Sequence, residues 1–384
     1  MTHNNQLPID AYTSVEFFDL EHKHIFSKTW AFAGFIEDLP NEGDYLSVQA
    51  GLNNVLIIKN NGELVAFHNM CRHRGTRLLE GKGNTDKKLI CPYHDWSYDL
   101  KGNLLSLPKV KTEFPDLDKS CNSLIKANIG IWRGMIWVHP NQDSESIEDW
   151  FGVINDYLGP HQIEQLIEPD NSIVIEEINA NWKVVVENYI DHYHLAQLHA
   201  GTLNMYDHKK AEFGFVGHHF RFWQPLSKNY FDDIKNNSPY PLLYDVSQGN
   251  LGTWVPMLFP GIGLTESEST WSIFHIKPIS VDKTQVVIRT KMKNTSSVEY
   301  LKQSYRSASF WQKNIKPKNA KYADDHPLGS ADFMKEDIFI CEQVQKSFYS
   351  PYFEFGALAQ KGEQPVKHHR ELVWQLIKPY WKHH

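Results

Sequence analysis

The sequence has few of the features that mark secreted, membrane-spanning or nucleic-acid-binding proteins. It holds only four cysteines in 384 residues, too few and too scattered for a disulfide framework. Its longest apolar run, at 129–138, is interrupted and too short to span a bilayer. No basic stretch followed by an apolar one opens the chain, so we expect no signal peptide and a cytoplasmic location. The net charge of -7 argues against a nucleic-acid partner.

Local patterns divide the chain into an all-β segment and a mixed segment. Short β-rich runs separated by turn signals predict a small all-β domain over residues 31–145. Strands followed by helices, without regular alternation, indicate an α+β domain over residues 146–384, to which we assign residues 1–30. The expected helices are 14–30, 181–200, 331–349 and 371–381, the expected strands are 172–179, 272–277 and 284–291, and a surface loop is expected at 236–250.

Two Cys–His pairs mark the first candidate metal site. Cys71 and His73 form one pair, and after seventeen intervening residues Cys91 and His94 form the other. Each pair on its own loop can clamp a compact cluster between two hairpin tips. Two thiolates and two imidazoles suit a 2Fe–2S centre, whose reduction potential the imidazoles raise. A structural zinc ion would accept the same ligands, although Cys-x-His is an unusual spacing for a zinc finger.

The sequence around these pairs resembles the two cluster loops of Rieske domains in the ring-hydroxylating oxygenase family. The resemblance rests on CRHRG at 71–75, on CPYHDW at 91–96, and on the following YDLKG and GIWRGMIWV stretches. Asp95 is a departure, because that family usually has glycine at this position. The resemblance implies that a 2Fe–2S cluster is held by Cys71, His73, Cys91 and His94.

His194 and His199, in the predicted helix 181–200, indicate a second metal site. A non-haem Fe(II) oxygenase binds its iron through two histidines and one carboxylate, which leaves positions open for O2 and substrate. On a regular helix a spacing of five separates two side chains by about 140°. The two histidines can therefore share an ion only if the helix ends, bulges or bends between them. Asp191, one turn before His194, can hydrogen-bond the outer ring nitrogen of His194.

The third ligand must lie far along the chain. Its candidates are Asp324, Asp325, Asp332, Glu336 and Asp337. The stretch 181–199 resembles the catalytic Asp-x-x-His-x-x-x-x-His motif of the same oxygenases, and 335–345 resembles their C-terminal helix. This resemblance implies that Asp337 completes the ligand set, with Asp332 and Glu336 as alternatives because a slip of one residue changes the helical face. Asn188 belongs to the matching stretch and is a candidate catalytic residue.

The resemblance also implies an electron route between subunits. In that family the equivalent of Asp191 bridges to a Rieske-ligand histidine of a neighbouring subunit. We therefore expect Asp191 to meet His94 or His73 of another chain, in a ring-shaped homotrimer. The implied fold is a Rieske domain plus a catalytic domain with an antiparallel sheet flanked by helices (helix-grip-like). His192 and His208 are interpreted as ordinary core or surface residues.

The implied activity is that of a terminal oxygenase. Electrons from NAD(P)H would arrive through a ferredoxin or a flavin/iron–sulfur reductase, and O2 would hydroxylate or demethylate a small organic substrate. Frequent aromatic residues after the second motif suit either a flat ring or a quaternary ammonium group. The compact chain resembles the α-only members, which include choline, betaine and carnitine monooxygenases. Aromatic-ring (di)hydroxylation and a Rieske electron carrier with a non-catalytic second domain stay open as alternatives.

Overall fold

The computed structural model describes residues 7–170, 172–237, 241–243, 251–294, 296, 298, 301–302, 322–323 and 325–382. The chain forms two compact units, one from residues 20–152 and the other from residues 1–19 and 153–384. The sequence placed these divisions at 30/31 and 145/146. Most of the surface loop predicted at 236–250 lies outside the described residues.

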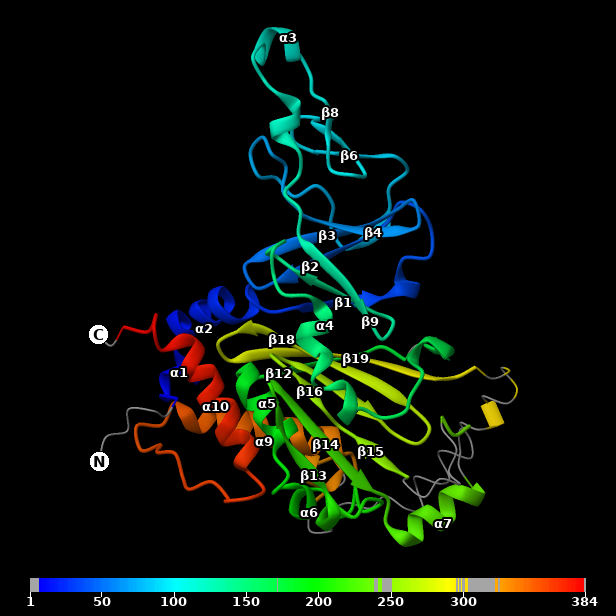
Figure 1. Cartoon of the computed structure of the whole chain (residues 1–384). Coiled ribbons are helices and arrows are strands. Elements are labelled where there is room, and N and C mark those ends of the chain that lie inside the picture. Colours follow the sequence, from blue (N-terminus) through cyan, green and yellow to red (C-terminus); the bar gives the residue numbers. More distant parts are fainter. Residues whose placement is uncertain are drawn as a thin grey trace. The chain divides into compact units, whose positions relative to one another are not determined.

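The unit formed by residues 20–152 contains three small antiparallel sheets (Figure 1). Its strands are β1 (Ala31–Phe35), β2 (Asp44–Ala50), β3 (Asn53–Asn60), β4 (Glu63–His68), β5 (Lys82–Asn84), β6 (Lys88–Ile90), β7 (Ser97–Asp99), β8 (Leu104–Ser106), β9 (Asn128–Trp132) and β10 (Met135–His139). Their orders are β1-β10-β9, β4-β3-β2-β5 and β6-β7-β8. Two short helices, α3 (Val110–Glu113) and α4 (Ile147–Gly152), complete the unit.

Strand β3 lies inside the four-stranded sheet because its apolar run is covered on both faces. Residues 55–58 are all fully buried, and alternate members belong to two different apolar clusters. A two-residue turn joins β3 to β4. Asn61 and Gly62 have φ of +55° and +79° there, the left-handed conformation that such a hairpin requires. The hairpin framework places one Cys–His loop after β4 and the other after β6.

The unit formed by residues 1–19 and 153–384 is built on one nine-stranded antiparallel sheet. Its strands are β11 (Leu166–Ile167), β12 (Val174–Ile178), β13 (Glu212–Val216), β14 (His219–Pro225), β15 (Gly252–Trp254), β16 (Met257–Leu258), β17 (Ile262–Glu266), β18 (Trp271–Ser280) and β19 (Lys283–Lys293). The main order is β11-β19-β18-β17-β15-β14-β13; β12 pairs with β19, and β16 pairs with both β14 and β17.

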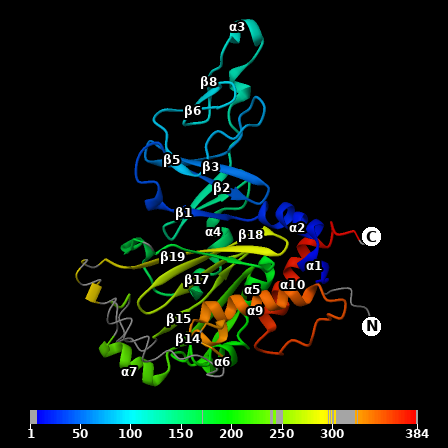
Figure 2. The ribbon, with the colours of Figure 1, turned by 180° about the vertical axis from the view of Figure 1, so that it is seen from behind.

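The helices of this unit are α1 (Asp10–Thr13), α2 (Val15–Glu21, which begins in this unit), α5 (Trp182–Ile190), α6 (Leu195–Leu198), α7 (Lys228–Asn237), α9 (Phe333–Phe348) and α10 (Gln364–Ile377). Helices α5, α9 and α10 lie together in both ribbon views (Figures 1 and 2). Helix α5 contacts α9 and α10 as well as strands β18 and β19. The α+β class predicted from the sequence is confirmed.

Three predicted helices differ from the structure. The helix predicted at 181–200 is interrupted, because Asp191 is extended (φ -75°, ψ 115°) and its carboxylate accepts a hydrogen bond from the Tyr193 backbone N–H at 2.6 Å. The helix predicted at 14–30 ends as an α-helix at Glu21, and a π-helical turn follows over His22–Phe26. The last helix starts seven residues earlier than predicted, at Gln364, with a proline in its first turn.

Candidate metal centres

The two Cys–His loops are built alike. In the first, Cys71 N–H donates to the carbonyl of Thr76 at 2.9 Å, and Gly75 N–H donates back to the Cys71 carbonyl at 3.0 Å. In the second, Cys91 N–H donates to Trp96 at 2.8 Å, and Asp95 N–H donates to Cys91 at 3.1 Å. Each cysteine is therefore fixed at the start of a tight, hydrogen-bonded turn.

The backbone conformation that the two loops share explains why glycine is usual at the position of Asp95 and why aspartate can replace it. Gly75 has φ +78° and Asp95 has φ +53°, so the fourth residue after each cysteine is left-handed. Glycine adopts this conformation without strain, and aspartate is one of the few other residues that tolerate it. Asp95 thus forms in the second loop the turn that glycine forms in the first.

The four predicted cluster ligands fit a 2Fe–2S centre. Cys71 and Cys91 are buried free cysteines, each 2% exposed. The imidazole centroids of His73 and His94 lie 4.7 Å apart. Among the residues that the structure describes, the Nδ1 atom of each imidazole is buried without a hydrogen-bond partner. Paired thiols beside two unsatisfied ring nitrogens are the donor set that a Rieske centre uses.

Neighbouring side chains orient these groups. The Tyr98 hydroxyl accepts a hydrogen bond from the Arg72 backbone N–H at 3.0 Å and shares a second one with Cys71 Sγ at 3.3 Å. Trp96 stacks on His73, with ring centroids 4.9 Å apart. Tyr98 was not predicted as part of this site, although it stands in the matching stretch that follows the second loop.

The second site begins where α5 ends. His194 and His199 are the residues that flank the single turn of α6, so each ring leaves the end of a short helix rather than its side. Their ring centroids lie 5.0 Å apart. The helix was expected to end, bulge or bend between the two histidines, but one helical turn joins His194 to His199 instead. The interruption lies just before His194, and His199 then ends the short helix.

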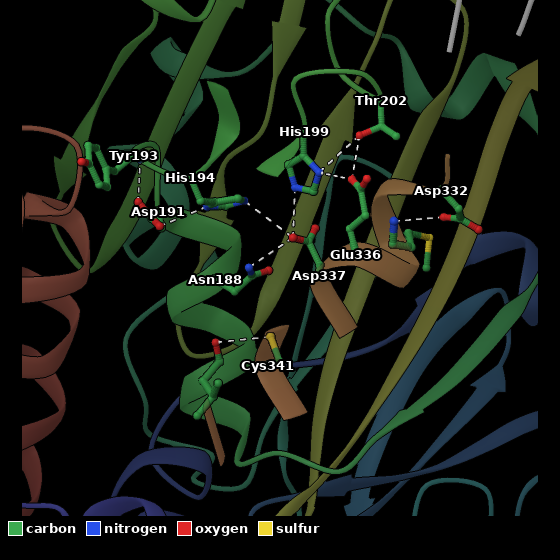
Figure 3. A network of polar contacts seen from close by, with 12 residues as sticks. Asn188, Asp191, Tyr193, His194, His199, Thr202, Asp332, Glu336, Asp337 and Cys341 are labelled. Carbon is green, nitrogen blue, oxygen red and sulfur yellow. Dashed lines mark hydrogen bonds and ion pairs between the residues drawn. The ribbon is translucent and has the colours of Figure 1, made fainter. Parts of the chain in front are cut away.

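Asp337 reaches the same point from α9 (Figure 3). Its Oδ1 atom lies 3.0 Å from Nε2 of His199 and 3.6 Å from Nε2 of His194. One ligand atom from each of the three residues lies within 4.8 Å of the others. The three side chains thus present two imidazoles and one carboxylate to a common point, the donor set of a mononuclear non-haem iron site.

Two further predicted residues contact this ligand set. Asp191 Oδ2 lies 3.1 Å from Nδ1 of His194, as the sequence spacing suggested. Asn188, in the last turn of α5, donates from Nδ2 to Asp337 Oδ1 at 3.2 Å. One contact directs the Nε2 lone pair of His194 towards the common point, and the other holds the carboxylate of Asp337.

The other carboxylate candidates are placed elsewhere. Asp332 caps the N-terminus of α9, where its carboxylate accepts from Met334 N–H at 3.0 Å. Asp325 is exposed in a turn, and Asp324 lies outside the described residues. Glu336 contacts His199 on the ring nitrogen opposite to Asp337, with Oε2 2.8 Å from Nδ1. Glu336 was expected only as an alternative ligand, and spacing along the chain does not reveal this contact.

The electrostatics of His199 reflect its two carboxylate neighbours. Burial alone lowers the pKa of an imidazole, but hydrogen bonds and charge from Asp337 and Glu336 outweigh burial and raise the pKa of His199 to about 9. The site thus concentrates negative charge around a buried ring, an arrangement that attracts a cation. Metal binding at Nε2 requires that nitrogen to be free of its proton.

A cluster of buried charged residues packs between α5 and α10. Arg370 donates from Nε and Nη2 to Glu187 Oε2, at 3.0 Å and 2.6 Å. The Tyr12 hydroxyl donates to the other oxygen of Glu187. Lys183 is fully buried, with its ammonium group 5.1 Å from the Tyr12 ring centroid. These contacts join α1 and α10 to the helix that carries Asn188.

The aromatic residues that follow the second metal motif differ in burial. Phe220, Phe222, Tyr230, Phe259 and Trp271 are buried, whereas Phe213, Phe215, Trp223 and Trp254 are half-buried. The ring of His192 stacks on that of Phe213, with centroids 4.7 Å apart, and its Nε2 lies 2.8 Å from the carbonyl of His208.

No helix in the described part of the chain is long and apolar enough to cross a membrane.

Comparison with known proteins identifies similar chains. Over 202 residues, the chain is 34% identical to the glycine betaine monooxygenase oxygenase subunit of Chromohalobacter salexigens, covering 52% of this chain and 44% of the relative. Over 196 residues, it is 33% identical to the large oxygenase component of the naphthalene 1,2-dioxygenase system of Pseudomonas aeruginosa, covering 49% and 43%. The chain thus spans less than half the length of either relative.

A solved structure has the same fold. The quaternary ammonium Rieske monooxygenase CntA, in complex with substrate L-carnitine, matches with a TM-score of 0.71 and 21% identity, covering 97% of this chain and 95% of that one. Residues 29–123 match the Rieske [2Fe-2S] domain. Residues 158–378, more than half of the chain, match the family described as ring hydroxylating alpha subunit (catalytic domain). The chain therefore belongs to the ring-hydroxylating alpha subunit family and carries a Rieske domain.

Proposed function

We propose that the chain is the terminal oxygenase of a Rieske-type non-haem iron system. The observation that carries the proposal is the convergence of His194, His199 and Asp337, whose ligand atoms lie within 4.8 Å of one another. They would hold Fe(II), which supplies a centre for O2 activation when bound. Residues 31–145 would form the cluster domain, and residues 1–30 and 146–384 the catalytic domain.

The chain's own side chains prepare this centre. The contact of Asp191 with Nδ1 fixes the tautomer of His194, and the amide of Asn188 fixes Asp337. Asp191 is part-exposed, so an imidazole of a neighbouring chain can reach it. We assign Asp191 the electron bridge to His73 or His94 of that chain, within a homotrimer. Cys71, His73, Cys91 and His94 would hold the cluster that stores the electron.

We propose a small quaternary ammonium compound as the substrate, hydroxylated or demethylated with O2. Support comes from the glycine betaine monooxygenase similarity and from the shared fold of CntA with L-carnitine. Half-buried aromatic side chains suit an alkylammonium group through cation–π contacts. Aromatic-ring (di)hydroxylation is the second candidate, favoured by the similarity to the naphthalene dioxygenase component. Electrons would come from NAD(P)H through a ferredoxin or a flavin/iron–sulfur reductase, and the chain would work in the cytoplasm.

A single-turnover experiment tests the activity without knowledge of the reductase. The cluster is reduced anaerobically with dithionite, excess reductant is removed, and O2 is added with glycine betaine, L-carnitine or naphthalene. We expect rapid cluster reoxidation and hydroxylated or dealkylated product with a quaternary ammonium substrate. His199→Ala should retain a reduced cluster and form no product. Reoxidation without product from any substrate, equal in both proteins, would instead indicate an electron carrier.

A further inference from the structure

We propose that Glu336 is a positioning residue that fixes His199 for metal binding. The inference rests on the proposed mononuclear iron site and adds a residue to it. Glu336 is fully buried, and its Oε2 atom lies 2.8 Å from Nδ1 of His199. Asp337, the next residue of α9, lies 3.0 Å from the opposite ring nitrogen, Nε2. Two consecutive residues thus hold one imidazole from both sides (Figure 3).

This contact determines which nitrogen of His199 carries the proton. A carboxylate that accepts at Nδ1 keeps a proton on that nitrogen, so Nε2 is the nitrogen that would give up its proton to bind a metal. The Nε2 atom faces the common point of the three ligands, 3.0 Å from Oδ1 of Asp337. A carboxylate on the outer nitrogen also raises the basicity of the ring.

Thr202 fixes Glu336 in turn. The Thr202 hydroxyl donates to the same Oε2 atom at 2.8 Å, and the backbone N–H of Thr202 donates to the His199 carbonyl at 3.2 Å. The loop that follows His199 therefore folds back onto the carboxylate that orients its ring. His194 has one such contact, from Asp191, and His199 has its own from Glu336, so each imidazole ligand is oriented by a separate acid.

The surroundings of Glu336 indicate that it positions His199 and does not stabilise the fold. Among the described residues, its Oε1 atom is buried without a hydrogen-bond partner. A buried carboxylate with one unsatisfied oxygen is a poor source of stability, and a neutral side chain of equal size often replaces such a group without loss. Glu336→Gln should therefore leave the melting temperature unchanged or higher while weakening the iron site.

Equilibrium dialysis against graded Fe(II), under anaerobic conditions, tests the proposal. Iron bound beyond the cluster is counted against acid-labile sulfide, so the cluster serves as an internal standard of folding. We expect Glu336→Gln to weaken Fe(II) binding about tenfold, at the low end of the 10–100-fold effect of removing such a partner. Glu342→Gln is the matched control, because Glu342 lies on the same helix but hydrogen-bonds Asn179 instead.

The outcomes are distinct. Weaker Fe(II) binding by Glu336→Gln, with sulfide content and melting temperature retained and Glu342→Gln unchanged, supports the positioning role. Fe(II) binding equal to that of the wild type overturns it. If Glu336→Gln fails to fold, Glu336→Asp is measured, and because its shorter side chain withdraws the carboxylate it should also weaken Fe(II) binding; unchanged binding overturns the role. A wild type that binds no Fe(II) beyond its cluster contradicts the proposed function, and not only the role of Glu336.

Discussion

Oδ1 of Asp337 lies 3.0 Å from Nε2 of His199, although 138 residues separate the two in the chain. The contact forms because α9 packs against α5, so tertiary packing assembles the ligand set. The contacts that hold α5 against α9 and α10 are therefore needed to bring the three ligands together.

The Glu187–Arg370 pair is expected to be a large contributor to the stability of the catalytic unit. Arg370→Ala leaves a buried carboxylate without its main partner, which should lower the free energy of unfolding by roughly 3 kcal/mol. Lys367→Ala, on the same helix, removes only an exposed 3.9 Å pair with Glu371 and should change it by less than about 1 kcal/mol. Urea unfolding compares the two. If both substitutions lower the free energy of unfolding equally, the buried carboxylate of Glu187 does not depend on Arg370 for its stabilisation.

Acid should destabilise the catalytic unit partly through His369. Burial, with positive charge from Lys183 and Arg370, lowers the pKa of His369 to about 3, so its ring is neutral in the folded chain above that value. The unfolded chain protonates it near its ordinary pKa of about 6.5. Stability is therefore lost as the pH falls from about 6.5 towards 3. His369→Gln should show a shallower decline in melting temperature over this range, and an unchanged slope would contradict the assignment.

Tyr98 is expected to raise the reduction potential of the cluster. Its hydroxyl lies 3.3 Å from Cys71 Sγ and would donate to that sulfur once it is a cluster thiolate, and hydrogen bonds to sulfur stabilise the more negative, reduced state. Tyr98→Phe should therefore lower the potential in a redox titration followed by circular dichroism. Tyr93→Phe is the control, because the Tyr93 hydroxyl accepts from Arg74 and no sulfur contact is found for it in the described structure. An equal shift in both variants would rule out the hydrogen bond as its cause.

Asp95→Gly should be tolerated and should move the potential upward. Glycine accepts the left-handed φ of +53° without strain, so the loop should become slightly more stable, by at most about 1 kcal/mol. Removing a negative charge next to His94 favours the reduced cluster. The shift should shrink as salt is added, because Asp95 is exposed. A lower potential, or loss of the cluster, would contradict this reading of the loop.

Local sequence determined much, but not all, of what the structure contains. The Cys–His loops and the Asp191–His194 contact follow from short-range spacing, so they could be predicted. The break after Ile190 could not, because it depends on the Asp191 carboxylate accepting a hydrogen bond from the Tyr193 backbone N–H instead of the helix continuing. The rotation of α9 about its axis decides which carboxylate contacts which ring nitrogen of His199, Glu336 at Nδ1 and Asp337 at Nε2. Sequence spacing alone left Glu336 and Asp337 as competing ligands.

The most direct test of the account is iron, zinc and acid-labile sulfide measured per chain after anaerobic purification, in the wild type and in His199→Ala. We expect about three irons and two sulfides in the wild type, and about one iron fewer in the variant at equal sulfide. About two irons in both proteins would leave the cluster but remove the mononuclear site. Zinc without sulfide would contradict the oxygenase account altogether.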